Sequence, residues 1–157
     1  IQGYCFGVGL EFSLACDFRI VTRNSQLSLP EMKIGMIPGS GGSVRLARMI
    51  GLSRVKDMIM RGKRISGEEA FNWGLASELV EKDKLEVTIS KLVDELCSVS
   101  PLAQRAIKTV LNTSQDAPLH VAIELEGETY GRLRSSDDFN EGVKSFVEKR
   151  KPVYKGN

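Results

Sequence analysis

Apolar and polar positions alternate in short blocks over the front of the chain. Between residues 1 and 31 the apolar stretches are brief and interrupted by turns, which is typical of strands and short helices. We predict strands at residues 1–5, 18–22 and 26–29, and a short buried helix at 10–16. The pattern therefore predicts an α/β arrangement for this part of the chain.

Glycine-rich turns and capping residues mark the elements that follow. Ser66 and Glu69 have the spacing of a capping box, in which each side chain bonds the backbone N–H of the other residue. Ser53 follows Gly51 and is predicted to cap a helix of its own. The predicted elements are helices at 43–50, 53–60 and 66–74, and a strand at 75–80.

The rest of the chain has a helical period and contains no internal repeat. Asp137 and Asp138 fall in the first turn of the last helix, where negative charge suits the helix dipole. The predicted helices are 84–98, 101–112, 119–133, and one from about Ser136 whose last turn is 148–151. We expect two parts, an α/β core over 1–83 and a helical carboxy-terminal region over 84–157.

Composition narrows the functional classes. The 157 residues are 41% hydrophobic and 27% charged, which suits one domain with a real core. The net charge is +2 and the pI about 8.5. Because domains that depend on nucleic acid usually have a pI above about 9, we expect no nucleic-acid partner. The apolar runs are too short to span a bilayer, so we expect no membrane partner either.

The three cysteines and the single histidine exclude several kinds of site. Cys5, Cys16 and Cys97 are odd in number and widely spaced, which favours neither a disulfide framework nor a zinc site. The lone His120 excludes any scheme that needs two histidines. A reducing compartment follows, and we expect a cytoplasmic protein, or a mitochondrial matrix protein that has lost a transit peptide. Since the chain opens on Ile1, we expect it to be the carboxy-terminal part of a longer protein.

Two acidic residues stand out because of their apolar surroundings. Glu11 lies within the apolar run 8–16, and Glu31 follows Pro30 and precedes several apolar residues. Burial raises the pKa of a carboxyl toward the range that is useful for proton transfer. Two such groups brought together could hold a water molecule and manage both of its protons. The alternative is that each acid forms a buried ion pair or a helix cap.

Glycine-rich turns flank both acids, at 7–9 and 39–42. Such turns can direct backbone N–H groups at an anion, although tight turns that enter helices fit the pattern equally well. The first turn has Phe12 where a dinucleotide fingerprint needs a third glycine, and the second lacks the Lys-Ser/Thr of a phosphate loop. Nucleotide binding is therefore disfavoured.

Other polar and aromatic residues are weaker candidates. We expect Asp17 to cap or end a helix, Phe71 and Trp73 to belong to the core, and His120 to lie on a helix surface. The basic run 149–151 is either a solvated helix end or a phosphate contact.

A series of distinct short blocks follows in a fixed order along the whole chain. They are residues 3–11, 14–17, 29–31, 35–42, 45–46, 62–70, 74–76, 138–139, 141–142 and 146–152. In residues, order and spacing these blocks resemble the enoyl-CoA hydratase/isomerase (crotonase) family. The resemblance implies an α/β fold: a crotonase-like spiral of ββα units followed by an α-helical carboxy-terminal region. It also implies a homotrimer, or a dimer of trimers, in which the helical region forms the subunit contacts.

The same resemblance assigns roles to individual residues. It implies that Glu11 orients and deprotonates a water molecule and that Glu31 delivers a proton to the α-carbon of the substrate. The backbone N–H of Val8 would be one donor of the oxyanion hole, and the N–H of Gly39 would help to hold the water. Val8 departs from the family, which usually has glycine there, and its side chain is expected to narrow the acyl pocket. The second oxyanion donor belongs to an earlier loop that this chain does not contain.

The implied activity is that of an enoyl-CoA hydratase, a lyase that uses no metal and no cofactor beyond the coenzyme A of its acyl-CoA substrate. Lys149 and Lys151 are candidates for contacts with the coenzyme A phosphates. Alternatives are an enoyl-CoA isomerase, a specialised acyl-CoA hydratase or lyase, and a non-catalytic family member that binds a partner or RNA. The presence of both Glu11 and Glu31 favours hydration, and the near-neutral charge argues against RNA.

Overall fold

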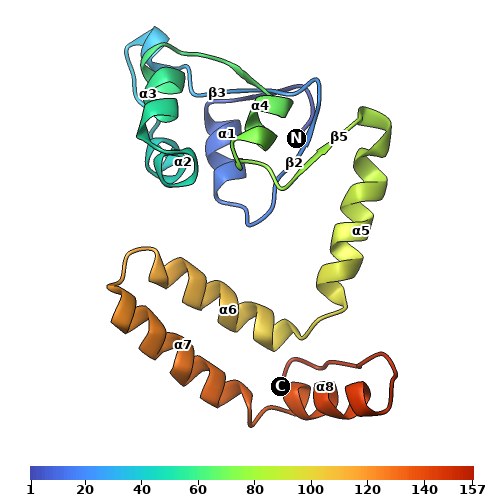
Figure 1. The fold of residues 1–157 in the computed structure, drawn as a ribbon. Coiled ribbons are helices and arrows are strands. Elements are labelled where there is room, and N and C mark those ends of the chain that lie inside the picture. Colours follow the sequence, from blue (N-terminus) through green and yellow to red (C-terminus); the bar gives the residue numbers. More distant parts are fainter. The chain divides into compact units, whose positions relative to one another are not determined.

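The computed structural model describes all residues, 1–157, and contains two compact units (Figure 1). The first comprises Ile1–Ser90 and the second Lys91–Asn157, so that the division falls within helix α5 (Leu85–Cys97). All the strands belong to the first unit, and the second contains helices and connecting segments only. The predicted order, α/β first and helical afterwards, is confirmed.

Five short strands form two small sheets in the first unit. Strand β3 (Gln26–Ser28) lies between β1 (Tyr4–Phe6), to which it is parallel, and β4 (Ile65–Ser66), to which it is antiparallel. Strands β2 (Ile20–Thr22) and β5 (Glu78–Val80) form a parallel pair. The registers place Leu27 opposite both Cys5 and Ile65, and Val21 opposite Leu79. Leu27 and Val21 are fully buried, as expected for strands in the interior of a unit.

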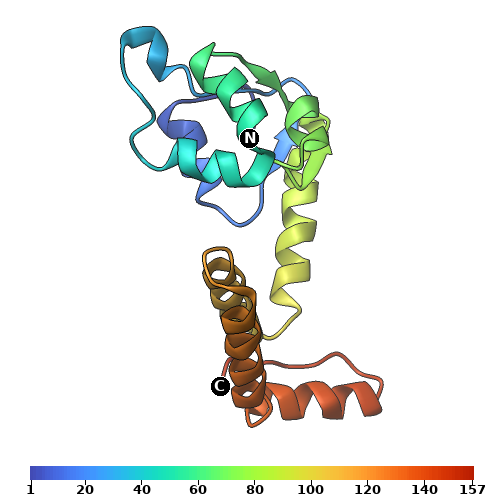
Figure 2. The same cartoon turned by 60° about the vertical axis from the view of Figure 1, so that its left-hand side comes forward.

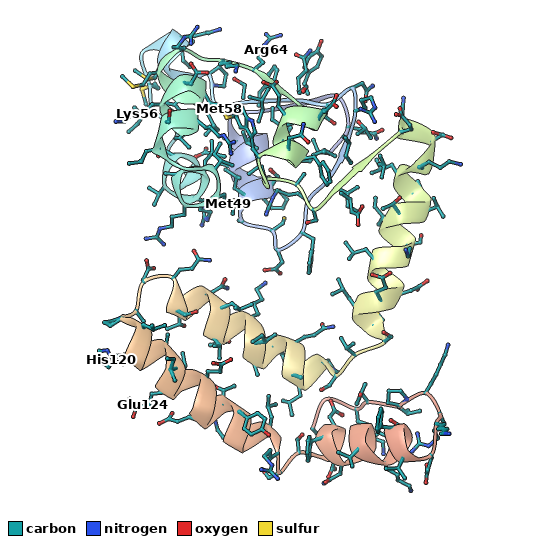
Figure 3. The ribbon with its side chains drawn as sticks, in the orientation of Figure 1. Met49, Lys56, Met58, Arg64, His120 and Glu124 are labelled. Atoms are coloured by element: carbon teal, nitrogen blue, oxygen red, sulfur yellow. The ribbon has the colours of Figure 1, made fainter.

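Short helices surround these strands. They are α1 (Val8–Leu14), α2 (Gly42–Ile50), α3 (Leu52–Met60), α4 (Gly67–Asn72) and the 3-10 helices η1 (Glu31–Ile34) and η2 (Lys82–Lys84). On α3, Met58 is fully buried whereas Lys56 is exposed and points away (Figure 3). The largest fully buried apolar side chains are Leu10, Leu14, Leu27, Leu29, Leu46, Met58, Ile65 and Leu75. They form one core cluster that joins α1, α2 and α3 to the strands.

The two capping predictions have opposite outcomes. The capping box is confirmed: the Glu69 N–H donates to Ser66 Oγ at 3.0 Å, and the Ser66 N–H donates to a Glu69 carboxylate oxygen at 2.9 Å. The cap at Ser53 is wrong, because α3 begins one residue earlier. Gly51, with φ of 81°, serves as the N-cap and no side chain caps the helix. The positive φ at Gly51 lets α3 follow α2 directly and leaves Ser53 inside the helix.

Several predicted boundaries also shift. The helix after Gly7 begins at Val8, so residues 8 and 9 belong to α1 and not to a loop. The first strand begins at Tyr4 and not at Ile1, whose terminal amino group donates to the Ile20 carbonyl. The 3-10 helix η1 was not predicted. No helix of the chain is both long and apolar enough to cross a membrane.

The second unit consists of helices and a carboxy-terminal tail. Helices α6 (Pro101–Ser114) and α7 (Leu119–Leu133) pack against each other (Figure 2). Helix α8 (Asp137–Val147) follows, with Ser136 as its N-cap. The bounds of α7 match the prediction.

The predicted end of α8 at residue 151 is wrong, because the helix closes with a Schellman motif. Lys149 adopts φ of 54°, the Lys149 N–H donates to the Phe146 carbonyl, and the Arg150 N–H donates to the Ser145 carbonyl. The helix therefore ends at Val147, and residues 149–151 lie beyond it.

Candidate active site

Glu11 lies on the buried face of α1, between Leu10 and Leu14. Its side chain is 3% exposed, and two backbone N–H groups satisfy one of its oxygens. The Ser40 N–H donates to Oε1 at 2.8 Å and the Gly42 N–H donates to the same atom at 2.9 Å. Because both bonds fall on Oε1, they fix the orientation of the carboxylate while neither donor occupies Oε2.

The first residue of α2 permits this close approach. A Cβ added at Gly42 would lie 2.7 Å from Glu11 Cγ and 2.8 Å from Oε1, so that no side chain fits there without moving the acid. The amino-terminal end of α2 also carries partial positive charge, which favours a carboxylate at that place. Gly42 and the loop before it thus position Glu11.

Glu31 opens the 3-10 helix η1, directly after Pro30. Its Oε2 is buried and has no hydrogen-bond partner within the chain. A buried polar atom without a partner is uncommon and costs free energy, and such atoms often mark functional sites. The carboxylate of Glu31 is thus available for a partner that is not part of this chain.

Both predicted acids lie near the start of α1. Gly7 adopts φ of 53° and ψ of −127°, and a Cβ on it would lie 2.9 Å from Glu31 Oε1. The carbonyl of the same glycine accepts the Glu11 N–H at 3.0 Å. Glu31 therefore lies against the residue whose carbonyl begins the helix that carries Glu11. The structure thus places Glu31 against Gly7, the N-cap of α1, and Glu11 in the first turn of the same helix.

The predicted backbone donors occupy this same region. Val8 is the first residue of α1, where the N–H group has no partner within the helix, and the residue is 70% exposed. Gly39 immediately precedes Ser40 in the loop that binds Glu11 and is exposed. The oxyanion role of Val8 and the water-holding role of Gly39 stay predictions.

Four residues of the site were not recognised as such from the sequence. Ser40 and Gly42 donate to Glu11, Gly7 lies against Glu31, and Arg45 donates from Nη1 to the Ser40 carbonyl at 2.8 Å. The sequence indicated only that glycine-rich turns lie near the acids. It gave no sign that the first turn would face Glu31 while the second would face Glu11.

The weaker candidates belong to other elements of the chain. Trp73 is half-buried against the core of the first unit, with the Arg54 guanidinium 4.9 Å from its ring centroid. His120 is exposed near the start of α7, with Glu124 one turn further along the helix (Figure 3). Lys149 and Lys151 are exposed in the segment after α8, and their contacts with coenzyme A stay predictions.

The cysteines and the possible metal-binding side chains form neither a disulfide nor a metal site. All three cysteines are free, and desolvation raises the pKa of the buried Cys5 thiol above its ordinary value. No group of three or more His, Cys, Asp or Glu side chains is placed to hold a metal ion. The chemistry that the site offers is that of two carboxylates and directed backbone N–H groups.

Comparison with known proteins gives consistent results. A family model described as enoyl-CoA hydratase/isomerase matches residues 1–157. A carnitinyl-CoA dehydratase of Salmonella typhi is 36% identical over 165 residues, which cover 99% of this chain and 61% of that relative. The crystal structure of an enoyl-CoA hydratase from Bacillus anthracis matches with a TM-score of 0.95 at 38% identity, over 99% of this chain and 60% of that one. Pseudomonas aeruginosa DspI matches with a TM-score of 0.92 at 33% identity, over 98% and 58% of the two chains.

These matches confirm the predicted fold, an α/β crotonase fold with a helical carboxy-terminal region. They also show that the chain spans about three-fifths of the length of the relatives that it matches. Because the family model covers every residue, the chain belongs to the enoyl-CoA hydratase/isomerase family.

Proposed function

We propose that the protein containing this chain catalyses the reversible addition of water across the 2,3 double bond of an unsaturated acyl-CoA thioester. The observation that carries the proposal is the placement of Glu11 and Glu31 at the first turn of α1. One acid is fixed through a single oxygen by two N–H donors, and the other has a buried oxygen without a partner. A hydratase needs two such groups, because water must lose a proton while the substrate gains one.

In the proposed reaction the two acids act on opposite ends of the double bond. Glu11 accepts a proton from water as the water oxygen bonds to the β-carbon. The π electrons of the double bond move toward the thioester carbonyl and form an enolate. Protonated Glu31 then gives its proton to the α-carbon. Transfer of a proton from Glu11 back to Glu31 through solvent restores the starting state, so that one water molecule is consumed in each turnover.

The enolate oxygen needs a donor, and the N–H of Val8 is proposed for this role. The exposed start of α1 supports the proposal, since a helix terminus leaves this N–H group free and directed outward. The N–H of Gly39 is proposed to help hold the attacking water. Removing one oxyanion donor typically lowers the rate by about 10²–10³-fold.

The contacts with coenzyme A and the oligomeric state are also proposals. Lys149 and Lys151 are proposed to contact coenzyme A phosphates, and their exposure after α8 supports this. A homotrimer, or a dimer of trimers, is proposed for the whole protein. It is supported by apolar side chains that the helices of the second unit leave exposed, among them Ile107, Ile123 and Phe146. We also propose a cytoplasmic location for the protein.

A second candidate has a specific basis in the relatives, several of which are named carnitinyl-CoA dehydratase. Dehydration is the reverse of the hydration proposed above, and the same two acids would exchange roles as base and acid. The two candidates therefore differ in the acyl group and in the direction of the reaction, and not in the machinery.

The test follows the loss of enoyl absorbance with crotonyl-CoA, using the full-length protein, Glu11→Gln, Glu31→Gln and the control Glu124→Gln. Glu124 is exposed on α7 and is expected to be dispensable. We expect each active-site variant to lose about 10²–10⁴-fold in rate, as is typical of a removed acid or base. A parent that binds crotonyl-CoA and carnitinyl-CoA but hydrates or dehydrates neither would contradict the proposal.

A further inference from the structure

The loop that holds Glu11 is itself held in place. The two donors to Glu11, the N–H groups of Ser40 and Gly42, lie on either side of the peptide group that joins Ser40 to Gly41. Gly41 adopts φ of 85°, in the left-handed region. The orientation of one N–H group relative to the other depends on the dihedral angles at Ser40 and Gly41, which this peptide group joins.

Arg45 contacts this peptide from one turn further along α2. Its Nη1 donates to the Ser40 carbonyl at 2.8 Å, and its backbone N–H donates to the Gly41 carbonyl at 3.0 Å. The guanidinium also packs against the Cα of Gly41 so closely that a Cβ added there would overlap Nη1. One residue therefore binds the carbonyl groups on both sides of Gly41.

This contact fixes the direction of the Ser40 carbonyl. Arg45 is exposed, so the carbonyl is held on the solvent side of the loop. If the peptide rotated, the carbonyl oxygen could turn toward Glu11, where its partial negative charge would repel the carboxylate. A guanidinium is permanently charged and donates through a planar fork, which suits it to hold a carbonyl oxygen in one orientation.

We propose that Arg45 is a positioning residue that acts through the Ser40–Gly41 peptide to keep Glu11 in its reactive orientation. The proposal rests on the proposed function of Glu11. Arg45 does not touch the reactants in this scheme. Its effect reaches the reaction through the two N–H donors that fix Oε1 and direct Oε2.

The kinetic test uses the full-length protein with Arg45→Ala, Arg45→Lys and the control Arg61→Ala. Arg61 is an exposed arginine at the C-cap of α3 that pairs with Asp57, so its loss removes the same side chain without removing a bond of the loop. We expect Arg45→Ala to lower kcat by roughly 10²-fold with little change in KM, because a small misplacement of a reacting group has about that cost. Arg45→Lys should retain part of the activity, and Arg61→Ala should retain nearly all of it.

A double variant separates positioning from other roles. In the Glu11→Gln background, Arg45→Ala should lower the remaining rate by no more than about twofold, because residues that act as one unit are not additive. An equal loss in both backgrounds would overturn the proposal and indicate a direct contact with the substrate. Parent-like activity of Arg45→Ala would also overturn it.

Hydrogen exchange at the Ser40 and Gly42 amides tests the geometry without reference to activity. We expect both amides to exchange faster in Arg45→Ala than in the parent or in Arg61→Ala, since loss of the carbonyl contact lets the loop open. If the parent has no hydratase activity, the proposed function fails while this measurement still stands. Unchanged exchange in Arg45→Ala would overturn the role of Arg45 alone.

Discussion

Two pairs of carboxylates, one in each unit, differ in how far their oxygens are hydrogen-bonded within the chain. In the second unit Asp138 is 4% exposed and all of its bonds are made within the chain. It accepts from Ser100 Oγ at 2.6 Å, from the Lys155 N–H at 2.8 Å and from the Gly156 N–H at 3.1 Å. These donors, the Ser100 hydroxyl first, lower the pKa of Asp138 below its ordinary value.

Glu141, one turn later on α8, also accepts several hydrogen bonds from within the chain. Arg150 donates to both of its oxygens, at 2.6 Å and 2.9 Å, and the Val153 N–H adds a third bond at 2.8 Å. The two bonds from Arg150 lower the pKa of Glu141 to about 2. Asp138 and Glu141 together fasten the carboxy-terminal tail to α8.

The pair in the first unit is arranged differently. The donors of Glu11 are concentrated on one oxygen, and Glu31 has a buried oxygen with no partner. A carboxylate that serves the fold has its oxygens satisfied by the fold, whereas one that serves a reaction must keep an oxygen for the reactant. Substitutions around the two pairs should therefore differ in whether they change activity or stability.

Among substitutions of the residues around the two pairs, the largest effect is expected for Gly7→Ala, which acts on both activity and stability. The positive φ of Gly7 is strained for alanine, at a cost of roughly 1–3 kcal/mol. The new Cβ would lie 2.9 Å from Glu31 Oε1 and displace the acid, so we expect kcat of the full-length protein to fall by roughly 10²-fold. Gly127→Ala in α7, where a Cβ meets nothing within 4 Å, is the matched control. Retained kcat in Gly7→Ala would show that the position of Glu31 is not critical.

Gly42→Ala should separate activity from stability more cleanly. The new Cβ would press on Glu11 Cγ and Oε1 and is expected to break one of the two hydrogen bonds that Oε1 accepts. The loss of one such bond corresponds to about a tenfold fall in kcat. Alanine is otherwise the better helix former by up to about 1 kcal/mol. We therefore expect Gly42→Ala to be neutral or stabilising in a Glu11→Ala background, as measured by thermal unfolding. A destabilised double variant would mean that the glycine is needed for another reason.

The sequence predicted those features whose causes are local. The capping box of Ser66 and Glu69 spans four residues, and the bounds of α7 follow from its own apolar period. Glu11 and Glu31 were singled out as candidates because each stands in an apolar stretch. The bonds from Ser40 and Gly42 to Glu11 were not found, because they join segments about thirty residues apart, whose meeting depends on how α1 packs against α2. A local pattern cannot predict such a contact.

For the structural pair, Asp138→Asn should change stability and leave catalysis intact. An asparagine that keeps its Oδ1 toward the Lys155 and Gly156 N–H groups turns its amide NH2 toward Ser100 Oγ, so the Ser100 hydroxyl loses its acceptor. We expect a lower melting temperature than in the control Asp137→Asn, whose side chain is exposed in the same turn. A changed kcat in folded Asp138→Asn would contradict the assignment of Asp138 to the fold and not to the reaction.

The smallest effect is expected for Glu141→Gln, and it should depend on pH. The folded state holds the pKa of Glu141 at about 2, below its ordinary value of 4.5, so the unfolded state binds more protons between these two values. The stabilisation is therefore fully present above the ordinary value and is lost as the pH falls toward 2. The difference in unfolding midpoint between the parent and Glu141→Gln should be largest near neutral pH and should close through this window. A difference in unfolding midpoint that persisted near pH 2 would contradict this. It would mean that packing of the side chain, and not the ionised carboxylate of Glu141, holds the tail.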